Sequence, residues 1–453
     1  MRDGVSQAVE LSGFRRATAN ARAAHARVSS VKLAMIRTAT PDRLRLTREP
    51  LAAVAFDPAA ATAVVDPHPA LHALRTQTPV AWSTTLGGWI LTRYDDVRTV
   101  LMDYRRFSSD RMRPFFEHLD PARRGTVAHL ERYITPWAVF NDPPVHTRVR
   151  TILNRTFIPR VEGMAPRIRT IVADLLAGLD GRADFDVIAD FAYPLPAAVI
   201  MTMMGTPLAD IASMRLWSDA LAEFIGSGLL APDKYARADA ATKAMADYFA
   251  AMIAARRRAP RDDLLSDLMQ PGDDGTRIAD DELVATAILM LFAGHETTTN
   301  LVTNGLSELL RHPAQLAALR AEPGLAPSAV EEVLRYQGPT AAMTRIVRED
   351  LDLAGVRLGA GDRVYAMINA ANRDPVRFPD PDRFDIRRRP NAILTFGAGI
   401  HLCVGAPLAR LEAQIALPAL LARFSALRAL EPERDWHVSV VLRGLRQFRV
   451  ATR

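Results

Sequence analysis

The pattern of apolar and polar positions along the chain is mostly that of amphipathic helices broken by prolines. From Phe56 onward, apolar residues recur every three or four positions, the spacing that places them on one helix face. Residues 143–157 begin with two prolines, which the first turn of a helix tolerates, and continue with Val149, Ile152 and Leu153 on one face. The same pattern predicts helices at roughly 160–180, 209–225, 232–257, 327–336 and 405–424.

The longest predicted helix runs from about Asp280 to Arg311. It opens with acidic residues and closes before His312-Pro313, as helix ends commonly do. Its centre, "ATAILMLFAG", is apolar nearly all round, so we expect it to be buried on every side. A helix of this length through the middle of a domain favours one large α-rich unit.

Strand patterns are short and late, at 344–350, at 356–368 around a glycine turn, and at 436–452. The predicted fold class is therefore mainly α with small antiparallel β-sheets. The sequence shows no internal repeat and no long low-complexity linker. We predict a basic N-terminal extension at 1–50, probably flexible by composition, followed by one domain at 51–453.

Composition changes this picture only at the N-terminus. Hydrophobic residues make up 49% of the chain and charged residues 24%, a globular profile. Residues 1–50 hold ten Arg or Lys and four acids, which accounts for the whole net charge of +6. This extension lacks the apolar centre of a secretory signal; a flexible tail, an amphipathic helix or an overlong start all fit it. Binding of nucleic acid or anionic lipid finds no support in the neutral remainder.

Two further counts restrict the class of protein. No run of about 18 uninterrupted apolar residues is present, so we expect no membrane span. A single cysteine excludes an internal disulfide and any structural zinc or iron–sulfur site that needs several thiolates from this chain. One thiol also fits a reducing cytoplasm.

That cysteine, Cys403, lies in "FGAGIHLCVG" just before a predicted helix. The glycines permit tight turns and close approach, and a thiolate at a helix N-terminus is stabilised, so its pKa should fall. Three interpretations are open. Cys403 is an inert buried cysteine, a nucleophile paired with His401, or an axial thiolate on haem iron. A separation of two residues does not orient His401 on the sulfur, which weakens the second.

The spacing Phe-x-x-Gly-x-x-x-Cys-x-Gly resembles the cysteine loop of the cytochrome P-450 family, soluble bacterial type. The resemblance implies the cytochrome P-450 fold, a single large domain around a buried haem with a long central helix. It implies that Cys403 is the iron ligand. Phe396 would pack on the haem side of the sulfur, and Gly399 and Gly405 would let amides point at it.

Within the longest helix, "AGHETT" resembles the family's oxygen-activation groove. A crossing of packed helices at small residues is the alternative interpretation, but Glu296 is an acid in an apolar run, where burial is costly. By resemblance, Thr297 would hydrogen-bond the dioxygen and Glu296 would help deliver protons through water. Ala293 and Gly294 would leave room over the haem. The resemblance assigns no role to His295.

Two more sets of residues match the family. Glu332 and Arg335 lie one helical turn apart and can pair, and Arg383 matches the third member of a structural Glu-Arg-Arg network. Haem carries two propionates, which need basic donors. The positions that match propionate ligands are His146, Arg150, Arg345 and His401.

The resemblance implies a haem-thiolate monooxygenase that uses haem b and dioxygen. It would insert one oxygen atom into a mainly apolar small organic substrate, by hydroxylation or epoxidation. Electrons would come from a separate ferredoxin and an NAD(P)H-dependent ferredoxin reductase, because no flavin or iron–sulfur region is visible. Candidate pocket residues are Phe140, Leu221, Phe224, Leu289, Phe292, Ala341, Met343 and Leu442. A peroxide-using or rearranging haem-thiolate enzyme and a non-catalytic haem-binding sensor remain open alternatives.

Overall fold

The computed structural model describes residues 53–453 except 55, 227–232, 273–274, 276 and 432. The predicted extension at 1–50 lies outside the described residues. The helices are α2 Ala61–Val65, α3 His68–Gln77, α4 Tyr94–Met102, α5 Met112–Glu117, α6 Pro121–Gly125, α7 Ala128–Ile134, α8 Val145–Glu162, α9 Ala165–Ala177, α10 Pro194–Met204, α11 Ile211–Gly226, α12 Lys234–Arg258, α13 Leu264–Leu268, α14 Asp280–Arg311, α15 Pro313–Ala321, α16 Ala326–Gln337, α17 Ile368–Ala371 and α18 Ala406–Arg423. The strands are β1 Ala53–Val54, β2 Val80–Ser83, β3 Gly88–Leu91, β4 Phe107–Ser108, β5 Asp184–Asp186, β6 Met343–Val347, β7 Leu351–Leu353, β8 Val356–Leu358, β9 Arg363–Ala366, β10 Arg428–Ala429 and β11 Arg449–Ala451.

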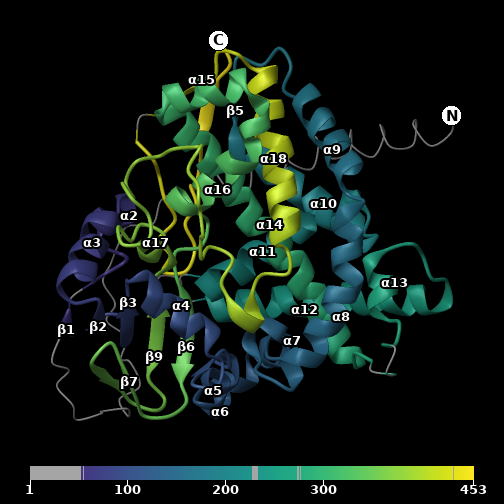
Figure 1. Cartoon of the computed structure of the whole chain (residues 1–453). Coiled ribbons are helices and arrows are strands. Elements are labelled where there is room, and N and C mark those ends of the chain that lie inside the picture. Colours follow the sequence, from purple (N-terminus) through teal and green to yellow (C-terminus); the bar gives the residue numbers. More distant parts are fainter. Residues whose placement is uncertain (1–52, 55, 227–232, 273–274, 276, 432) are drawn as a thin grey trace.

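The long helix α14 has the predicted bounds and passes through the middle of the molecule (Figure 1). Its acidic first turn complements the helix dipole, and the carboxylate of Glu282 accepts a hydrogen bond from the N–H of Ala279 at 3.1 Å. It ends where Pro313 begins the next helix. Helices α10, α12, α16 and α18 all contact it, so α14 is the axis on which the helical part is built.

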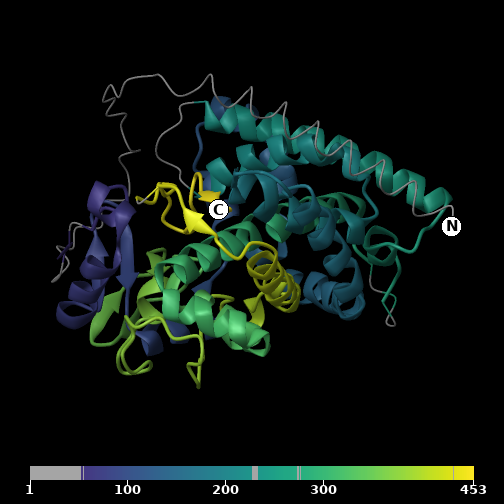
Figure 2. The same cartoon turned by 90° about the horizontal axis from the view of Figure 1, so that it is seen from above.

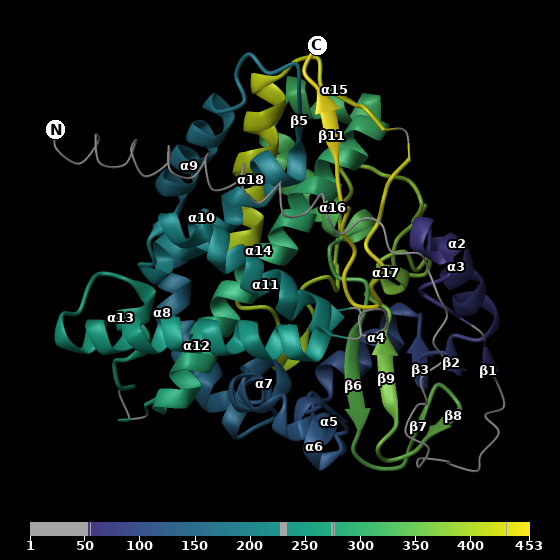
Figure 3. The ribbon, with the colours of Figure 1, turned by 180° about the vertical axis from the view of Figure 1, so that it is seen from behind.

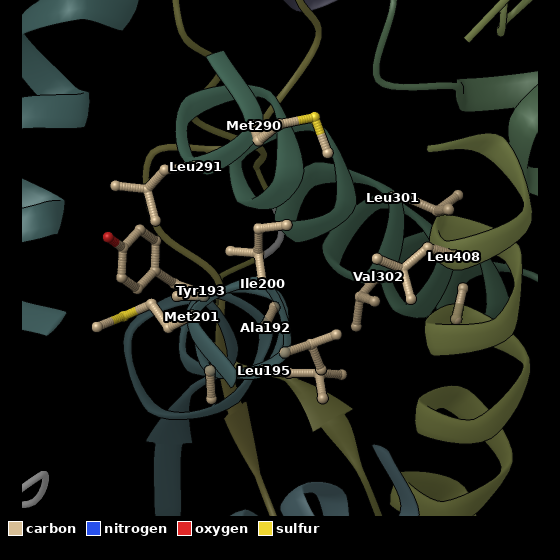
Figure 4. Close-up of a cluster of buried hydrophobic side chains, with 14 of the residues drawn as sticks. Ala192, Tyr193, Leu195, Ile200, Met201, Met290, Leu291, Leu301, Val302 and Leu408 are labelled. Atoms are coloured by element: carbon tan, nitrogen blue, oxygen red, sulfur yellow. The ribbon is translucent and has the colours of Figure 1, made fainter. Parts of the chain in front are cut away.

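The largest hydrophobic core surrounds this axis. Side chains from α10, α14 and α18 meet in one cluster, with Val302 of α14 beside Leu408 of α18 (Figure 4). Helix α10 is apolar all round, and all but one of its eleven residues are buried. The packing fixes α14 rigidly, which holds any functional group on it in place.

The strands of the largest sheet and the pair β7-β8 gather at one side of the molecule, next to the purple N-terminal helices (Figures 1 and 2), whereas β5 and β11 lie at the end that carries the C-terminus (Figure 3). The largest sheet has the order β1-β2-β3-β9-β6-β4. Strands β6 and β9 pair antiparallel and lie side by side in Figure 3. The pairings β1–β2 and β3–β9 are parallel, so this sheet is mixed; the long chain between β3 and β9 supplies the crossover that parallel pairing needs.

The two smaller sheets, β10-β11-β5 and β7-β8, are antiparallel as predicted. Of the strand predicted at 436–452, only Arg449–Ala451 forms one. None of the helices in the described part of the chain combines the length and the apolar character that a membrane span requires.

Candidate active site

The cysteine loop is a tight structure pressed against α4. Gly397 and Gly399 have φ values of +76° and +69°, a left-handed region that favours glycine. A side chain at Gly399 would meet the carbonyl oxygen of Leu101 at 2.9 Å. Gly399 is thus needed for close packing on α4, a different reason from the amide orientation predicted for it. The N–H of Cys403 donates to the carbonyl of Phe396 at 2.9 Å and closes the loop.

The sulfur of Cys403 faces an internal space. The residue is exposed, yet desolvation raises the pKa of its thiol above the usual value. The exposure of Cys403 and the raised pKa of its thiol are both explained if its exposed atoms face a space inside the protein rather than bulk solvent. The amides of Gly405 and Ala406 hydrogen-bond to the sulfur and, with Arg150, act in the opposite direction. The predicted net fall of this pKa is therefore wrong, because desolvation outweighs the effect of the helix N-terminus.

The predicted propionate donors lie close to one another, and among the described residues none of them forms an ion pair with an acidic side chain. The rings of His146 and His401 are 4.3 Å apart, and burial lowers the pKa of His401 to about 3 and that of His146 less far. In the described part of the chain, Nδ1 of His146 and Nε2 of His401 are buried without a hydrogen-bond partner. Arg345 is buried, its Nη1 donates to the carbonyl of Thr344 at 2.8 Å, and its pKa falls to about 10.

A further arginine in this region was missed by sequence reasoning. Burial, the first cause, and the nearby charge of Arg345 together lower the pKa of Arg111 to about 10. Its Nε is buried without a partner among the described residues. Arg111 lies in a loop without periodicity, so nothing in the local pattern marks it.

These residues fit a haem group. Buried donors without acceptors are costly, and two propionates would satisfy them and offset the positive charge of Arg111, Arg150 and Arg345. The described residues contain no group of three or more His, Cys, Asp or Glu side chains that could hold a metal ion.

The predicted oxygen groove opens at the middle of α14. From Leu283 to Leu291 the residues of α14 are buried or partly buried, but Ala293, in the centre of the helix, is exposed. The prediction that the helix is buried on every side is therefore wrong at this point. The hydroxyl of Thr297 donates back to the carbonyl of Ala293 at 3.4 Å. A side chain at Gly294 would meet Cγ1 of Ile200 at 2.9 Å, so close packing on α10 explains this glycine.

Glu296 lies in a mainly apolar environment with a few polar neighbours. Desolvation, followed by the negative charge of Asp219, raises its pKa to about 7, while Asn300 and Arg215 act in the opposite direction. A carboxyl group that titrates near neutrality can both accept and donate a proton. His295 is buried against the ring of Tyr193 at 5.3 Å, which is a packing role.

Comparisons with known proteins agree with this geometry. The family model "Cytochrome P450" matches residues 82–437. The chain belongs to the cytochrome P450 family. It is 42% identical over 392 residues to cytochrome P450 107B1 of Saccharopolyspora erythraea, covering 84% of this chain and 93% of that protein. It is 42% identical over 402 residues to the cytochrome P450 monooxygenase PikC of Streptomyces venezuelae, covering 86% and 91%.

Among solved structures, that of CalO2 superposes with a TM-score of 0.81 at 34% identity and covers 88% of this chain and 99% of CalO2. The predicted cytochrome P450 fold is confirmed. As a cytochrome P450, the protein is an oxygen-incorporating oxidoreductase with a haem-iron cofactor. It acts with redox partners, an organic substrate and dioxygen.

The structural network of this cytochrome P450 differs from the prediction in one member. Glu332 and Arg335 pair through two hydrogen bonds of 2.8 Å, and both side chains are fully buried. Arg383 has a side chain that is 66% exposed, with its nearest carboxylate, Asp385, at 3.8 Å. Only its backbone carbonyl accepts from Arg335, at 3.1 Å. Arg388 supplies the second guanidinium and so is the third member of the network, 3.3 Å from Glu332.

The network reaches the cysteine loop through Asn372 and Thr395. The carbonyl of Asn372 accepts from Arg335 at 3.1 Å, and its side chain bonds to the hydroxyl of Thr395 at 2.8 Å. That hydroxyl donates to the carbonyl of Leu334 at 2.7 Å. The partly buried ring of Phe396, the next residue, lies 4.4 Å from the guanidinium of Arg410. Arg410 also pairs with Glu331 at 2.5 Å, so it is not a freely solvated charge.

The candidate pocket residues fall into separate groups. Trp137, which sequence reasoning missed, stacks on Phe140 at 5.8 Å and on Phe292 at 5.6 Å and so joins two predicted members. Phe224 lies instead with Phe115, at 6.0 Å. The remaining members are buried or partly buried: Leu221, Leu289, Ala341, Met343 and Leu442. Ala341 and Leu442 come together because the N–H of Ala341 donates to the carbonyl of Val441 at 2.9 Å.

Proposed function

We propose that this cytochrome P450 holds haem b through Cys403 and inserts one oxygen atom into a mainly apolar, small organic substrate. The reaction would be a hydroxylation or an epoxidation. The observation that carries the proposal is the thiol of Cys403, which faces the interior with the amides of Gly405 and Ala406 on its sulfur. Such hydrogen bonds withdraw charge from a thiolate and tune its donor strength.

The basic cluster would hold the propionates. His146, Arg111, Arg150, Arg345 and His401 supply donors from several elements, so the group would be fixed in position and orientation. When bound, haem supplies the redox chemistry, which uses dioxygen, two electrons and two protons to oxygenate the substrate and form water. The thiol of Cys403 would lose its proton on binding iron, which would reverse the effect of burial on its pKa.

The residues of α14 would handle protons. Glu296, with a pKa of about 7, can take a proton from water and pass it toward the hydroxyl of Thr297. The apolar side chains around Phe140 and Phe292 would exclude bulk water and admit an apolar substrate. The buried aromatic contacts of Trp137 support this preference.

Electrons would come from a separate ferredoxin and an NAD(P)H-dependent ferredoxin reductase in the cytoplasm. The chain covers 91% of PikC and 93% of the 107B1 protein, so little of either relative lies outside the match. Residues 51–453 would form the monooxygenase domain, with residues 1–50 as an extension outside the described part.

The test uses a surrogate ferredoxin and reductase with a compound selected by its spin-state shift of the haem. In Thr297→Ala, product formed per NAD(P)H should fall by about tenfold or more, with hydrogen peroxide released instead. Thr303→Ala is the matched control, because the hydroxyl of Thr303 bonds to the carbonyl of Thr299 at 2.8 Å on the same helix. Full activity of Thr297→Ala with added peroxide would identify a peroxide-using enzyme. Absence of turnover with any ferredoxin would identify a sensor.

A further inference from the structure

A second polar cavity, of about 180 Å³, lies away from the cysteine site. It is enclosed by the start of α3, the C-terminal ends of α14 and α16, and the segment 434–443 (elements in Figure 1). Glu308, in its wall, is eleven residues beyond Thr297 on α14, which corresponds to roughly 16 Å along a helix. None of the residues assigned to the haem or the oxygen groove lines it.

The wall of this cavity is rich in arginine. Four line it: Arg311, Arg373, Arg434 and Arg443. Two of them are neutralised by carboxylates, because Arg434 pairs with Glu308, and Arg373 pairs with Asp382 at 3.0 Å. Arg373 is also held by the carbonyl of Tyr336, at 2.8 Å. These ion pairs hold Arg373 and Arg434 in place, whereas Arg311 and Arg443 are not paired in this way.

Arg443 is held in place with unused donor capacity. It is 8% exposed, its Nη2 donates to the carbonyl of Val65 at 2.8 Å, and its guanidinium stacks 3.7 Å from the ring of Trp436. Its Nε is buried and has no partner among the described residues. Burial, the first cause, and the nearby charge of Arg434 lower its pKa to about 9, so it still carries a charge at neutral pH.

Arg311 is exposed at the rim, and its guanidinium forms no hydrogen bond or ion pair with the described residues. Among the residues that line the cavity, two carboxylates act on these arginines: Glu308, which already pairs with Arg434, and Asp66, whose Oδ1 accepts the N–H of His68 at 3.1 Å. Burial and the charges of Arg373 and Arg443 hold the pKa of His68 well below its usual value, so it adds no charge of its own. The cavity therefore has an excess of positive charge and a buried donor with nothing to bind.

We propose that this cavity binds a small oxyanion of the phosphate class, held by Arg311 and Arg443. The guanidinium of Arg443 is fixed by its contacts, and that of Arg311 at the rim can turn toward it, so the two could bind a tetrahedral oxyanion that accepts from the unused Nε of Arg443. The bound anion would join α3, α14, α16 and the segment 434–443. The same segment carries Leu442 and bonds to Ala341, so occupancy would stiffen one wall of the candidate substrate pocket.

The experiment titrates inorganic phosphate into the purified haem-loaded protein at constant ionic strength, set with sodium chloride, and follows heat release and Tm. We expect one saturable site and a rise in Tm that saturates with it. Arg311→Gln should weaken binding by about tenfold, the loss expected for one charge-assisted contact. Arg311 is exposed, so this variant should fold; Arg169→Gln, at an exposed arginine on α9, is the matched control and should bind like the wild type.

A response that rises linearly and is equal in all three proteins would be general screening of charge and would overturn the proposal. So would equal weakening in Arg311→Gln and Arg169→Gln. Methyl phosphate separates the two sources of such an anion. If it binds as well as inorganic phosphate, the site accepts a phosphate monoester of a small molecule; if inorganic phosphate alone binds, the ligand is the free ion.

Discussion

Desolvation sets the state of individual residues in the active site. It raises the pKa of the Cys403 thiol and the Glu296 carboxyl, and it lowers the pKa of Arg345, so each shift favours the neutral form. The sequence indicated most of the groups that we propose for the site, but not Arg111. It predicted the wrong direction for Cys403, because burial cannot be read from a loop sequence.

Glu296 gives a stability prediction whose sign follows from its raised pKa. The folded protein keeps a proton up to about pH 7 that the unfolded chain releases near the ordinary pKa of 4.5. The free energy of unfolding therefore decreases as the pH rises through this range. Glu296→Gln removes the effect, so its stability relative to wild type should be about 2 kcal/mol greater at pH 8 than at pH 5.

Urea unfolding of the purified proteins at the two pH values measures this difference. Glu349→Gln, at an exposed position in a surface turn, serves as the control and should behave alike at both pH values. The same stability difference for Glu296→Gln at pH 5 and pH 8 would show that Glu296 is not held protonated near neutrality.

Elements with a clear period were predicted well. The bounds of α14 agree to the residue, because an acidic start, an apolar centre and a final proline all mark it. The third member of the buried network was missed, because Arg383 and Arg388 both lie in an irregular segment where no period shows which side chain points inward. The backbone turns at Arg383 so that its carbonyl, not its guanidinium, faces Arg335.

This correction yields a matched pair of variants in one segment. Arg388→Ala removes a guanidinium that bonds to the buried Glu332 and should lower the free energy of unfolding by about 1–3 kcal/mol. Arg383→Ala removes an exposed side chain and should change it by less than about 0.5 kcal/mol. Urea unfolding of the two variants and of the wild type measures these changes in the free energy of unfolding. A larger loss in Arg383→Ala would restore Arg383 as the network member.

At the scale of the whole molecule, the sequence predicted the fold class, which the comparisons confirm, but not how distant segments meet. The mixed sheet depends on β3 pairing with β9. The aromatic cluster of the candidate substrate pocket depends on Trp137 contacting both Phe140 and Phe292. Such contacts come from tertiary packing, which leaves no local pattern. The substrate is poorly encoded for the same reason.

The division of the chain gives a prediction at this scale. Removing residues 1–45 should leave haem content and the spectrum of the protein unchanged, because the haem ligand and the basic cluster all lie within the domain at 51–453. Absorption spectra of the full-length and shortened proteins, purified side by side, measure this. Loss of haem from the shortened protein would show that the extension belongs to the domain.

The most direct test of the central claim is the carbon monoxide difference spectrum of the dithionite-reduced protein, recorded for the wild type and for Cys403→Ser. Because Cys403 is the single thiol in the chain, the wild type should show the strongly red-shifted Soret band of thiolate ligation. Cys403→Ser should keep its fold, checked by circular dichroism, and lose that band. An unchanged band in Cys403→Ser, or a histidine-type band in the wild type, would contradict ligation of the haem iron by Cys403.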